Sequence, residues 1–463
     1  MIHLFEHQNK ERVDIPLLDL EQFLNEVWNQ RAYGRSPTER FREQRLLQLF
    51  HPGQAIKARK YVGVILYKGL RINLLPKVFY HPDRTYNTEQ LGQINRHLLW
   101  WLSYCHKLNF PHHRMGMDTQ ESDFLEVLIQ LFASYTHQLI QKMLYQQFEE
   151  NSRETHYLKG RLNFNTYAKQ NLGTGRWHTF HCSYDAFVLD NKFNQIIKYV
   201  CQLLLPATQS RKSKQHLKEI LFILSEVRDV KCSYEDCLGV QFNPLFAEFK
   251  TVRDYCALFL QNAVSYSYKK DLQLFAFLLP MDAVFEAFIS GFIQTELPEI
   301  SLMTQRSDTY LDQEKKFKLK PDLYIAPRQG AHLIADTKYK LPLNKKQSPQ
   351  TGIAQADLYQ MVSYAVRFQV QRLLLLYPGT IEGCVGHINQ IEVEDLLADQ
   401  QNICIEAHQL PIICHDLLEN PSPIKQSLNQ CFAETKTELK TVLSRLFEPL
   451  DIGPKGVQGE FDQ

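Results

Sequence analysis

The sequence has almost no net charge, no long apolar run and no signal-peptide pattern, and each absence excludes a class of protein. Because 52 Lys and Arg face 51 Asp and Glu, the net charge is +1, so attraction to nucleic acid must come from local patches. No uninterrupted apolar stretch approaches the roughly 20 residues of a membrane span. Residues 1–6 lack the basic flank and apolar run of a signal peptide. We therefore expect a cytoplasmic protein with no membrane contact.

Two common ligand motifs are also missing. The ten cysteines include no CxxC pair, and the nearest two, Cys232 and Cys237, are separated by four residues. This spacing argues against zinc and predicts buried free thiols in a reducing compartment. No GxxxxGK[ST] phosphate loop occurs, since the glycine segments at 173–176 and 453–456 are too short and differently composed. Any NTP-driven step must therefore come from another protein.

The chain does contain enough apolar material for two or three domains. Of its 463 residues 44% are hydrophobic, with 28 Phe and 22 Tyr. The pattern predicts a mixed α/β (α+β) protein in four parts: a strand-rich N-terminal domain (1–115), a helical middle domain (116–265), a C-terminal α/β domain (266–450) and a disordered tail (451–463).

Local patterns predict the elements of the first two domains. Residues 60–67 and 70–77 read as a β-hairpin that turns at Lys68 and Gly69. Residues 157–162 read as a loop or short strand. Apolar residues at helical spacing predict helices at 17–30, 89–103, 124–135, 193–205, 217–227 and 243–263.

The C-terminal domain shows a different order of elements. A helix is expected at 282–295, then strands at 322–326 and 332–339 joined by a turn at 327–330. A helix at 354–369 and an apolar strand at 372–377 follow. The order α-β-β-α-β predicts a compact mixed unit.

Asp322, Asp336 and Lys338 carry the predicted chemistry. Asp336 and Lys338 are two apart on a strand, so they project to one face, and the turn brings Asp322 beside them. Two converging carboxylates repel unless a cation lies between them, and Mg²⁺ prefers such oxygen ligands. The metal would activate water against a phosphodiester, with Lys338 orienting the water or offsetting negative charge. The alternative is a hairpin with incidental charges, in which Lys338 makes an ordinary cross-strand ion pair.

Residues on the two flanking helices are further candidates. Glu286 lies within an apolar helical run, as either a third metal ligand or a surface residue. Gln360 and Tyr364 are four apart on the next helix, where they either contact or support the site or form a surface pair. Asp357 and Lys340 are weaker candidates of the same kind.

Lysines surround this site in the sequence. Such runs are usually solvated faces, but beside a phosphate-cleaving centre they predict contacts with the DNA backbone. They are Lys315, Lys316, Lys318 and Lys320 before the site, and Lys340, Lys345 and Lys346 after it.

Several segments together resemble the McrC family, the nuclease subunits of McrBC modification-dependent restriction systems. The resemblance extends over residues 60–377, and nothing after residue 380 contributes to it. The segments that carry it are 61–65 (YVGVI), 72–77 (INLLPK), 158–162 (LKGRL), 190–198 (DNKFNQIIK), 285–286 (FE), 321–322 (PD), 336–340 (DTKYK) and 357–361 (DLYQM).

The resemblance implies a PD-(D/E)xK nuclease fold in the C-terminal domain and an AAA+ partner. McrC-like proteins dock on a hexameric ring of McrB, a GTPase that recognises methylated cytosine, stimulate its NTP hydrolysis and cut DNA. It therefore implies a McrB-like ring and modified double-stranded DNA as partners, with Mg²⁺ as cofactor. Either the hairpin at 61–77 or the helical middle domain could contact the ring.

Two other functions are compatible with the same residues. A PD-(D/E)xK fold also serves stand-alone DNA repair or processing nucleases. A decayed nuclease domain would leave a non-catalytic activator of an AAA+ ring. The large portion outside the nuclease motifs argues against the first, and the intact Asp322, Asp336 and Lys338 argue against the second.

Overall fold

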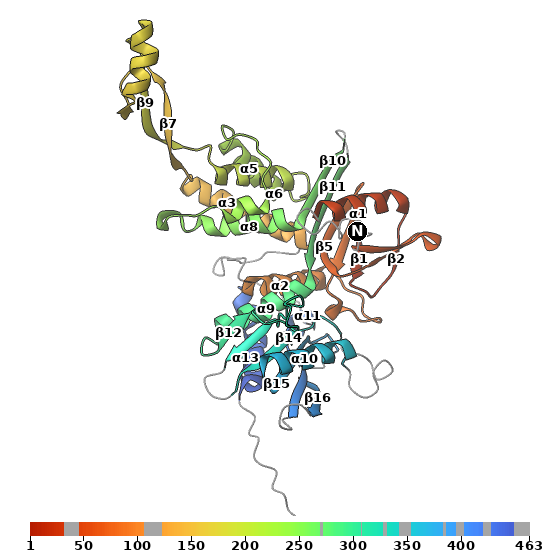
Figure 1. Ribbon diagram of the computed structural model, residues 1–463. Helices are drawn as coiled ribbons and strands as arrows, with labels where there is room; N and C mark the ends of the chain where they lie inside the picture. Colours follow the sequence, from red (N-terminus) through yellow and green to blue (C-terminus); the bar gives the residue numbers. More distant parts are fainter. Residues whose placement is uncertain are drawn as a thin grey trace, which may run out of the picture.

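The computed structural model shows a body built on two main sheets, from which a thin arm projects (Figure 1). The residues described are 1–31, 46–105, 123–268, 272–306, 308–326, 331–341, 353–382, 386–394, 402–419 and 427–448. Of the helices within these ranges, none combines the length and hydropathy needed to cross a bilayer. Among the cysteines described, Cys182, Cys201, Cys232, Cys237, Cys256, Cys404 and Cys414 are free thiols. The predicted mixed α/β class is confirmed, since helices and strands alternate through the chain.

The N-terminal sheet has five strands in the order β1-β6-β5-β11-β10. Its centre is the predicted hairpin, in which Lys68 and Gly69 turn with positive φ. β11 pairs antiparallel with β5 although some 200 residues separate them, so residues 263–280 complete this sheet. The strands are β1 (Ile2–Phe5), β5 (Tyr61–Tyr67), β6 (Leu70–Leu75), β10 (Ala263–Tyr268) and β11 (Leu272–Pro280).

A second core lies between this sheet and a small three-stranded sheet. Apolar residues of α1 (Leu17–Arg31) pack there against β4, β5 and β6. The small sheet has the order β2-β4-β3, with β2 at Glu11–Arg12, β3 at Leu47–Phe50 and β4 at Ala55–Ala58.

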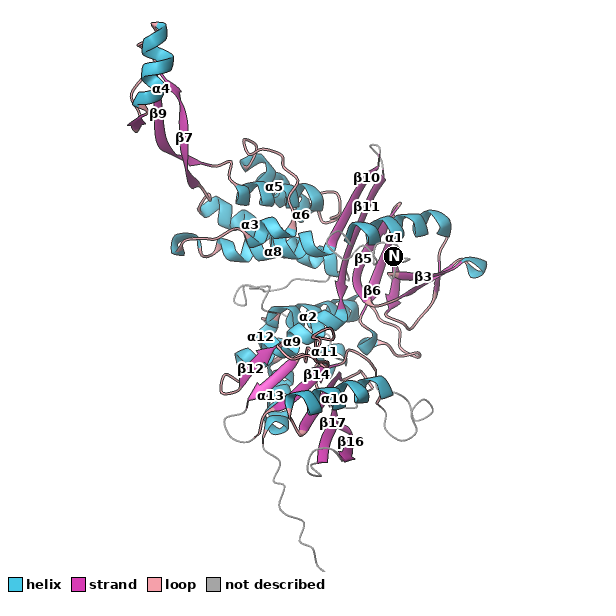
Figure 2. Ribbon diagram, in the orientation of Figure 1, coloured by secondary structure: helices cyan, strands magenta, loops and turns pink. Residues whose placement is uncertain are grey.

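Helices form a layer beside the N-terminal sheet (Figure 2). The prediction of one helix over 243–263 is wrong at its start. Pro244 lacks the N–H of a helix interior and begins a short 3₁₀ turn capped by Asn243, so α8 begins only at Phe249. The helix predicted at 217–227 lies earlier, because Ser210 caps its start. The helices are α2 (Thr88–Tyr104), α3 (Phe124–Lys142), α5 (Lys192–Leu204), α6 (Arg211–Ile223), α7 (Tyr234–Leu238) and α8 (Phe249–Asn262).

The middle of the chain also contains an arm that the helical prediction missed. β7 (Gln147–Thr155) and β9 (Phe180–Val188) pair antiparallel along their whole length, and β8 (Arg161–Leu162) joins β9, as the expected short strand. The tip holds α4 (Phe164–Thr166) and two further helical turns. The arm extends away from the body in Figure 1. β7 is almost entirely polar in sequence and so lacks the alternation by which a half-buried strand is recognised, whereas β9 alternates and buries Cys182 and Tyr184 on one face.

The C-terminal sheet has six strands in the order β12-β13-β14-β15-β17-β16. Ile334, Leu373 and Leu375 on one face pack with α10, whereas Leu323, Ala335 and Leu374 on the other belong to the large core that includes α9 and α13. The predicted α-β-β-α-β order is incomplete, because β12 at Ser301–Thr304 adds a strand between α9 and β13 that the prediction missed. The turn at 327–330 and the tail at 451–463 lie outside the described residues, and the division into domains stays a prediction.

The elements of this part extend beyond residue 380. The strands are β12 (Ser301–Thr304), β13 (Leu323–Ala326), β14 (Leu333–Thr337), β15 (Arg372–Pro378), β16 (Gly386–Glu394) and β17 (Asn402–Leu410). The helices are α9 (Met281–Glu296), α10 (Gln355–Phe368), α11 (His415–Glu419), α12 (Leu428–Cys431) and α13 (Ala433–Phe447).

Candidate active site

Asp322 and Asp336 lie opposite each other on two neighbouring strands. β13 and β14 pair antiparallel with Leu323 opposite Ala335, so the same register continued by one residue sets Asp322 opposite Asp336. Asp322 Oδ2 accepts hydrogen bonds from the backbone N–H and the hydroxyl of Thr337, at 2.8 and 2.7 Å. These bonds fix one carboxylate at the end of the strand that carries the other.

The pKa of Asp336 shows that the negative charge of Asp322 disfavours ionisation of the Asp336 carboxyl. Its side chain is only 2% exposed. Burial, followed by the charge of Asp322, raises the pKa of Asp336 to about 6, while Lys338 acts in the opposite direction. A buried carboxylate facing a second one is stabilised by any added positive charge. The pair is thus arranged as a place for a cation.

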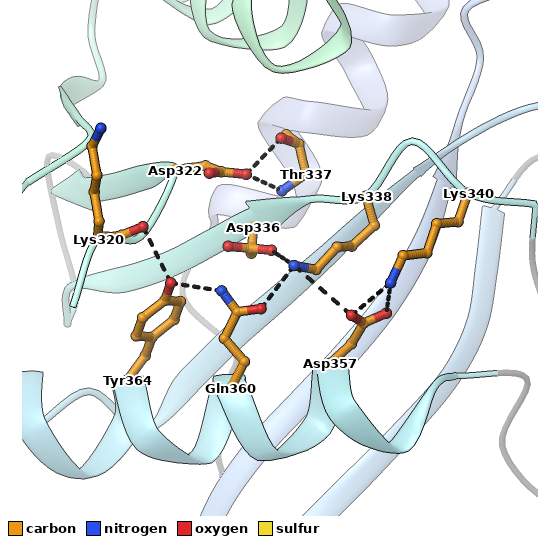
Figure 3. Close-up of polar contacts among 9 residues, drawn as sticks. All are labelled: Lys320, Asp322, Asp336, Thr337, Lys338, Lys340, Asp357, Gln360 and Tyr364. Atoms are coloured by element: carbon orange, nitrogen blue, oxygen red, sulfur yellow. Dashed lines mark hydrogen bonds and ion pairs between the residues drawn. The ribbon is translucent and has the colours of Figure 1, made fainter. Parts of the chain in front are cut away.

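Lys338 lies beside this pair and is held from two sides. Its Nζ is 2.5 Å from Asp336 Oδ2 and donates a hydrogen bond to Gln360 Oε1 at 2.8 Å. The backbone N–H of Lys338 donates to Leu376 O and so extends the β14–β15 ladder by one residue. The ammonium is therefore positioned by a sheet on one side and by α10 on the other, as Figure 3 shows.

α10 contributes a chain of hydrogen bonds to the site. Gln360 Nε2 donates to the Tyr364 hydroxyl at 2.7 Å, and that hydroxyl donates to the Lys320 carbonyl oxygen at 3.1 Å. Gln360 and Tyr364 thus face the strands rather than solvent, and together they link Lys338 to the segment that precedes Asp322 (Figure 3). In this structure they support the lysine.

Asp357 and Lys340 form a second ion pair at the same end of α10. Lys340 Nζ donates to both carboxylate oxygens of Asp357, at 2.8 and 2.9 Å. Lys338 Nζ lies 3.9 Å from Asp357 Oδ1. The Asp357 side chain is buried, whereas about half of the Lys340 side chain is exposed.

Glu286 approaches from α9, on the other side of the strand ends. It accepts a hydrogen bond from Gln305 Nε2 at 2.6 Å, and the backbone N–H of Gln305 donates to Asp322 O at 3.0 Å. Burial, followed by the charge of Asp322, raises the pKa of Glu286. Glu286 is therefore near enough to Asp322 for the two carboxylates to interact electrostatically.

The carboxylate oxygens of Asp322 and Asp336 are the possible metal ligands at this site. Among the residues described, no group of three or more His, Cys, Asp or Glu side chains is set to hold a metal ion. The site instead offers two carboxylates, and Mg²⁺ is commonly bound through one or two carboxylates with water and substrate phosphate completing its shell. The opposed pair Asp322 and Asp336 fits such an ion, with Glu286 nearby.

Three contributors to the site are absent from the sequence prediction. They are the hydroxyl and N–H of Thr337, the Lys320 carbonyl and the Gln305 amide. Lys320 acts through its backbone carbonyl, which no residue pattern reveals, and the Gln305 side chain comes from the end of β12, a strand that the prediction did not include. Only Thr337, between Asp336 and Lys338, was open to inference, because a hydroxyl next to two strand-end acids can bond to one of them.

The lysines around the site divide into two sets. Lys315, Lys316, Lys318 and Lys320 are exposed on the segment between β12 and β13. Lys345 and Lys346 lie outside the described residues.

A family model described as "McrBC 5-methylcytosine restriction system component" matches residues 56–378. The chain belongs to this family. The matched range contains every candidate site residue from Glu286 to Tyr364, and it ends with β15. The predicted resemblance to McrC is thereby confirmed.

A solved structure of a McrBC assembly shares the fold. A chain in the refined half-complex of the tetradecameric assembly of Thermococcus gammatolerans McrB AAA+ hexamers with bound McrC matches with a TM-score of 0.67 at 18% identity. The match covers 96% of this chain and 99% of that one. A chain in the cryo-EM structure of the McrBC complex of the same organism matches with a TM-score of 0.48 at 20% identity, covering 64% and 88%. No curated protein matches this McrBC-family chain.

Proposed function

We propose that this McrBC-family chain is a Mg²⁺-dependent DNA endonuclease subunit that cuts DNA in complex with an AAA+ NTPase. The observation that carries the proposal is the opposed pair Asp322 and Asp336 with the Lys338 ammonium beside it. Carboxylates on two adjacent strands followed by a lysine are the pattern of PD-(D/E)xK nucleases. In this chain the pattern is supported by structure as well as by spacing, because Lys338 forms an ion pair with Asp336 and the charge of Asp322 acts on Asp336.

Each residue has a role in this proposal. Asp322 and Asp336 would hold the ion, with Glu286 beside them as a further candidate ligand. Bound there, Mg²⁺ would polarise the scissile phosphate and acidify a neighbouring water. The Lys338 ammonium, fixed by Gln360, would orient that water and offset the negative charge that develops on the phosphate oxygens during attack. Lys340 would hold an adjacent phosphate.

The proposed partner is a hexameric AAA+ ring of the McrB type. The T. gammatolerans assembly contains McrB AAA+ hexamers with bound McrC. No phosphate-loop motif occurs in the present sequence, so the NTPase belongs to another protein. The family description, which names 5-methylcytosine, supports modified double-stranded DNA as the target and defence against foreign DNA as the role.

The arm is the better of the two candidate contacts with the ring. In the hairpin at 61–77, β5 is hydrogen-bonded to β6 on one side and β11 on the other, and most side chains are buried. The arm exposes large apolar side chains instead, as protein-binding surfaces do. These are Tyr157, Leu158, Phe164, Leu172, Trp177 and Phe187.

The test is a cleavage assay of the chain co-purified with the AAA+ product of a neighbouring gene. We expect Mg²⁺- and NTP-dependent cutting of methylated plasmid, and no cutting of unmethylated plasmid. Asp336→Ala should abolish cutting but leave NTPase stimulation intact, whereas Asp14→Ala, an exposed acid far from the site in sequence, should change neither. Cutting that survives Asp336→Ala refutes the site.

The same assay separates the two alternatives. Cleavage by this chain without partner or nucleotide would identify a stand-alone nuclease. NTPase stimulation without cleavage by the wild-type complex, on either plasmid, would identify a non-catalytic activator.

A further inference from the structure

The segment between β12 and β13 forms a projecting loop beside the candidate active site. We call residues 308–320 the Phe317 loop. It runs from the edge strand β12 to Asp322, so its C-terminal end leads directly into the site. Its lysines were predicted above to contact the DNA backbone, and its Lys320 carbonyl accepts from Tyr364, but Phe317 has no role so far.

Internal hydrogen bonds give the Phe317 loop a defined shape. Tyr310 and Lys318 form an antiparallel β-bridge. The N–H of Leu311 donates to Phe317 O at 2.8 Å, and the N–H of Leu319 donates to Thr309 O at 3.0 Å. The loop is therefore a small hairpin rather than a freely sampling connection.

The Asp312 side chain stabilises the tip of this hairpin. The carboxylate of Asp312 accepts hydrogen bonds from the N–H groups of Lys316 (3.0 Å) and Phe317 (2.8 Å). These bonds hold the two peptide groups that precede the Phe317 side chain, which lowers the entropic cost of using this side chain in binding.

Two contacts fix the loop to α10. Arg367 Nε donates to Tyr310 O at 2.8 Å, and the Tyr364 hydroxyl donates to Lys320 O at 3.1 Å. The second contact continues through Gln360 to Lys338, as Figure 3 shows. The loop therefore has a fixed position relative to the ammonium at the site.

The exposed surface of the loop is apolar at its tip and basic around it. Phe317 is 66% exposed and Leu311, across the hairpin from it, is 48% exposed. Lys315, Lys316 and Lys318 surround them, and within residues 308–320 four lysines face three acids, Asp308, Asp312 and Glu314. Asp308 is bound to Arg306, Asp312 to the loop backbone and Glu314 to Lys316, so two of the three acids do not pair with a loop lysine side chain.

A single exposed aromatic ring is common on protein surfaces, but an exposed ring set among lysines beside a candidate phosphate-cleaving site has the composition of a nucleic-acid contact. The lysines around this ring specify a partner with dense negative charge and apolar surface between the charges. Duplex DNA has both, in its phosphates and in the base edges and faces within its grooves. The active site close to the loop places such a duplex within reach.

We propose that the Phe317 loop enters a groove of the DNA next to the scissile phosphate. Phe317 contacts the bases there, and Lys315, Lys316 and Lys318 bind the flanking phosphates. The inference rests on the proposed nuclease function. It adds that the Phe317 loop determines which phosphate of the duplex lies in the active site. Through Tyr364 and Gln360, the same contact aligns Lys338 with the bound strand.

The experiment measures DNA binding and cutting separately on the complex of the full chain with its AAA+ partner. Binding is followed by fluorescence anisotropy of a labelled methylated duplex with Ca²⁺ in place of Mg²⁺. Phe317→Ala should weaken binding about tenfold, the scale of removing one base–aromatic interaction, and Phe317→Trp should restore it. The control is Phe222→Ala, which removes an exposed phenylalanine from α6 and should have no effect.

The contribution of the loop lysines is measured by the salt dependence of DNA binding. Lys315→Gln with Lys318→Gln should lower the slope of log Kd against log salt by about 0.9 for each phosphate that is no longer neutralised. The control pair Lys212→Gln with Lys214→Gln, on exposed positions of α6, should leave that slope unchanged.

The outcomes separate this inference from the proposed function. Wild-type cutting together with unchanged binding and cutting by the Phe317 and lysine variants overturns the loop inference and leaves the nuclease standing. Wild-type binding without cutting refutes the nuclease, while the binding losses still support the loop. A loss of complex assembly in Phe317→Ala, seen by size-exclusion chromatography, identifies a protein contact and also overturns the inference.

Discussion

The ammonium of Lys77 donates a hydrogen bond to the carbonyl oxygen of Tyr339, 2.7 Å away, although 262 positions separate them in the chain. The same ammonium lies 4.3 Å from the centre of the Tyr339 ring. Lys77 follows β6, and Tyr339 follows Lys338. The N-terminal sheet is therefore joined to the strand end that carries the candidate catalytic residues.

Lys77→Met should weaken this junction while keeping most of the aliphatic stem. The Tyr339 carbonyl would lose a charged donor, which costs about 1–3 kcal/mol of unfolding free energy. We expect lower stability in chemical denaturation and slower DNA cutting by the partner complex, because Lys338 is the adjacent residue. Lys212→Met, on exposed α6, is the matched control and should change neither. Equal denaturation midpoints for Lys77→Met and wild type would show that the contact stabilises nothing.

Glu6 gives the same junction a pH dependence. Its carboxylate is buried and accepts a hydrogen bond from the Lys77 N–H at 3.3 Å, and burial raises its pKa from 4.5 to about 7. The folded chain thus binds this proton more tightly than the unfolded chain. The stabilisation is complete below pH 4.5 and is lost as the pH rises through 7.

Glu6→Gln should therefore reduce the loss of stability between about pH 5 and about pH 8, by up to about 3 kcal/mol relative to wild type. Urea denaturation at a series of pH values measures the difference. Glu11→Gln changes an exposed glutamate on β2 and should keep the wild-type pH profile. Parallel profiles for Glu6→Gln and wild type would mean that Glu6 is not protonated on folding.

Some contacts of the site could be predicted from the sequence, and others could not. Asp322 and Asp336 could be placed together because strand periodicity and a short connection fix their faces and their distance. The Lys77–Tyr339 contact could not, since nothing local in either segment encodes a partner so distant in the chain. The arm was missed for a different reason. The strand 147–155 is almost entirely polar in sequence, and a strand is recognised by the alternation of apolar and polar residues.

Gln360→Leu tests whether the amide positions Lys338. The substitution removes the acceptor 2.8 Å from Lys338 Nζ at similar volume. We expect kcat for DNA cutting to fall roughly tenfold or more, the scale of losing a residue that supports a catalytic group, with unchanged DNA affinity in Ca²⁺. Tyr364→Phe should lower kcat less, because Gln360 keeps its contact with Lys338.

The control for this pair is Val366→Ala, which alters an exposed side chain on the same helix and should leave kcat at the wild-type value. A Gln360→Leu variant that loses DNA affinity while keeping its kcat would place Gln360 in binding and not in the positioning of Lys338.

The arm provides the test of partner docking. Trp177 is 68% exposed and Phe164 lies on the same tip, so neither stabilises the body of the chain, yet both present apolar surface far from the candidate active site (Figure 1). In a protein interface such aromatic residues carry much of the binding free energy, commonly about 2 kcal/mol or more each. Phe164→Ala with Trp177→Ala should therefore raise the concentration of this chain needed for half-maximal NTPase stimulation by about tenfold or more, with unchanged thermal stability. Leu245→Ala, an exposed apolar residue near the start of α8, should leave that concentration unaltered. If the double variant stimulates the partner as wild type does over the whole titration, docking uses another surface, and the exposed aromatics of the arm need a different explanation.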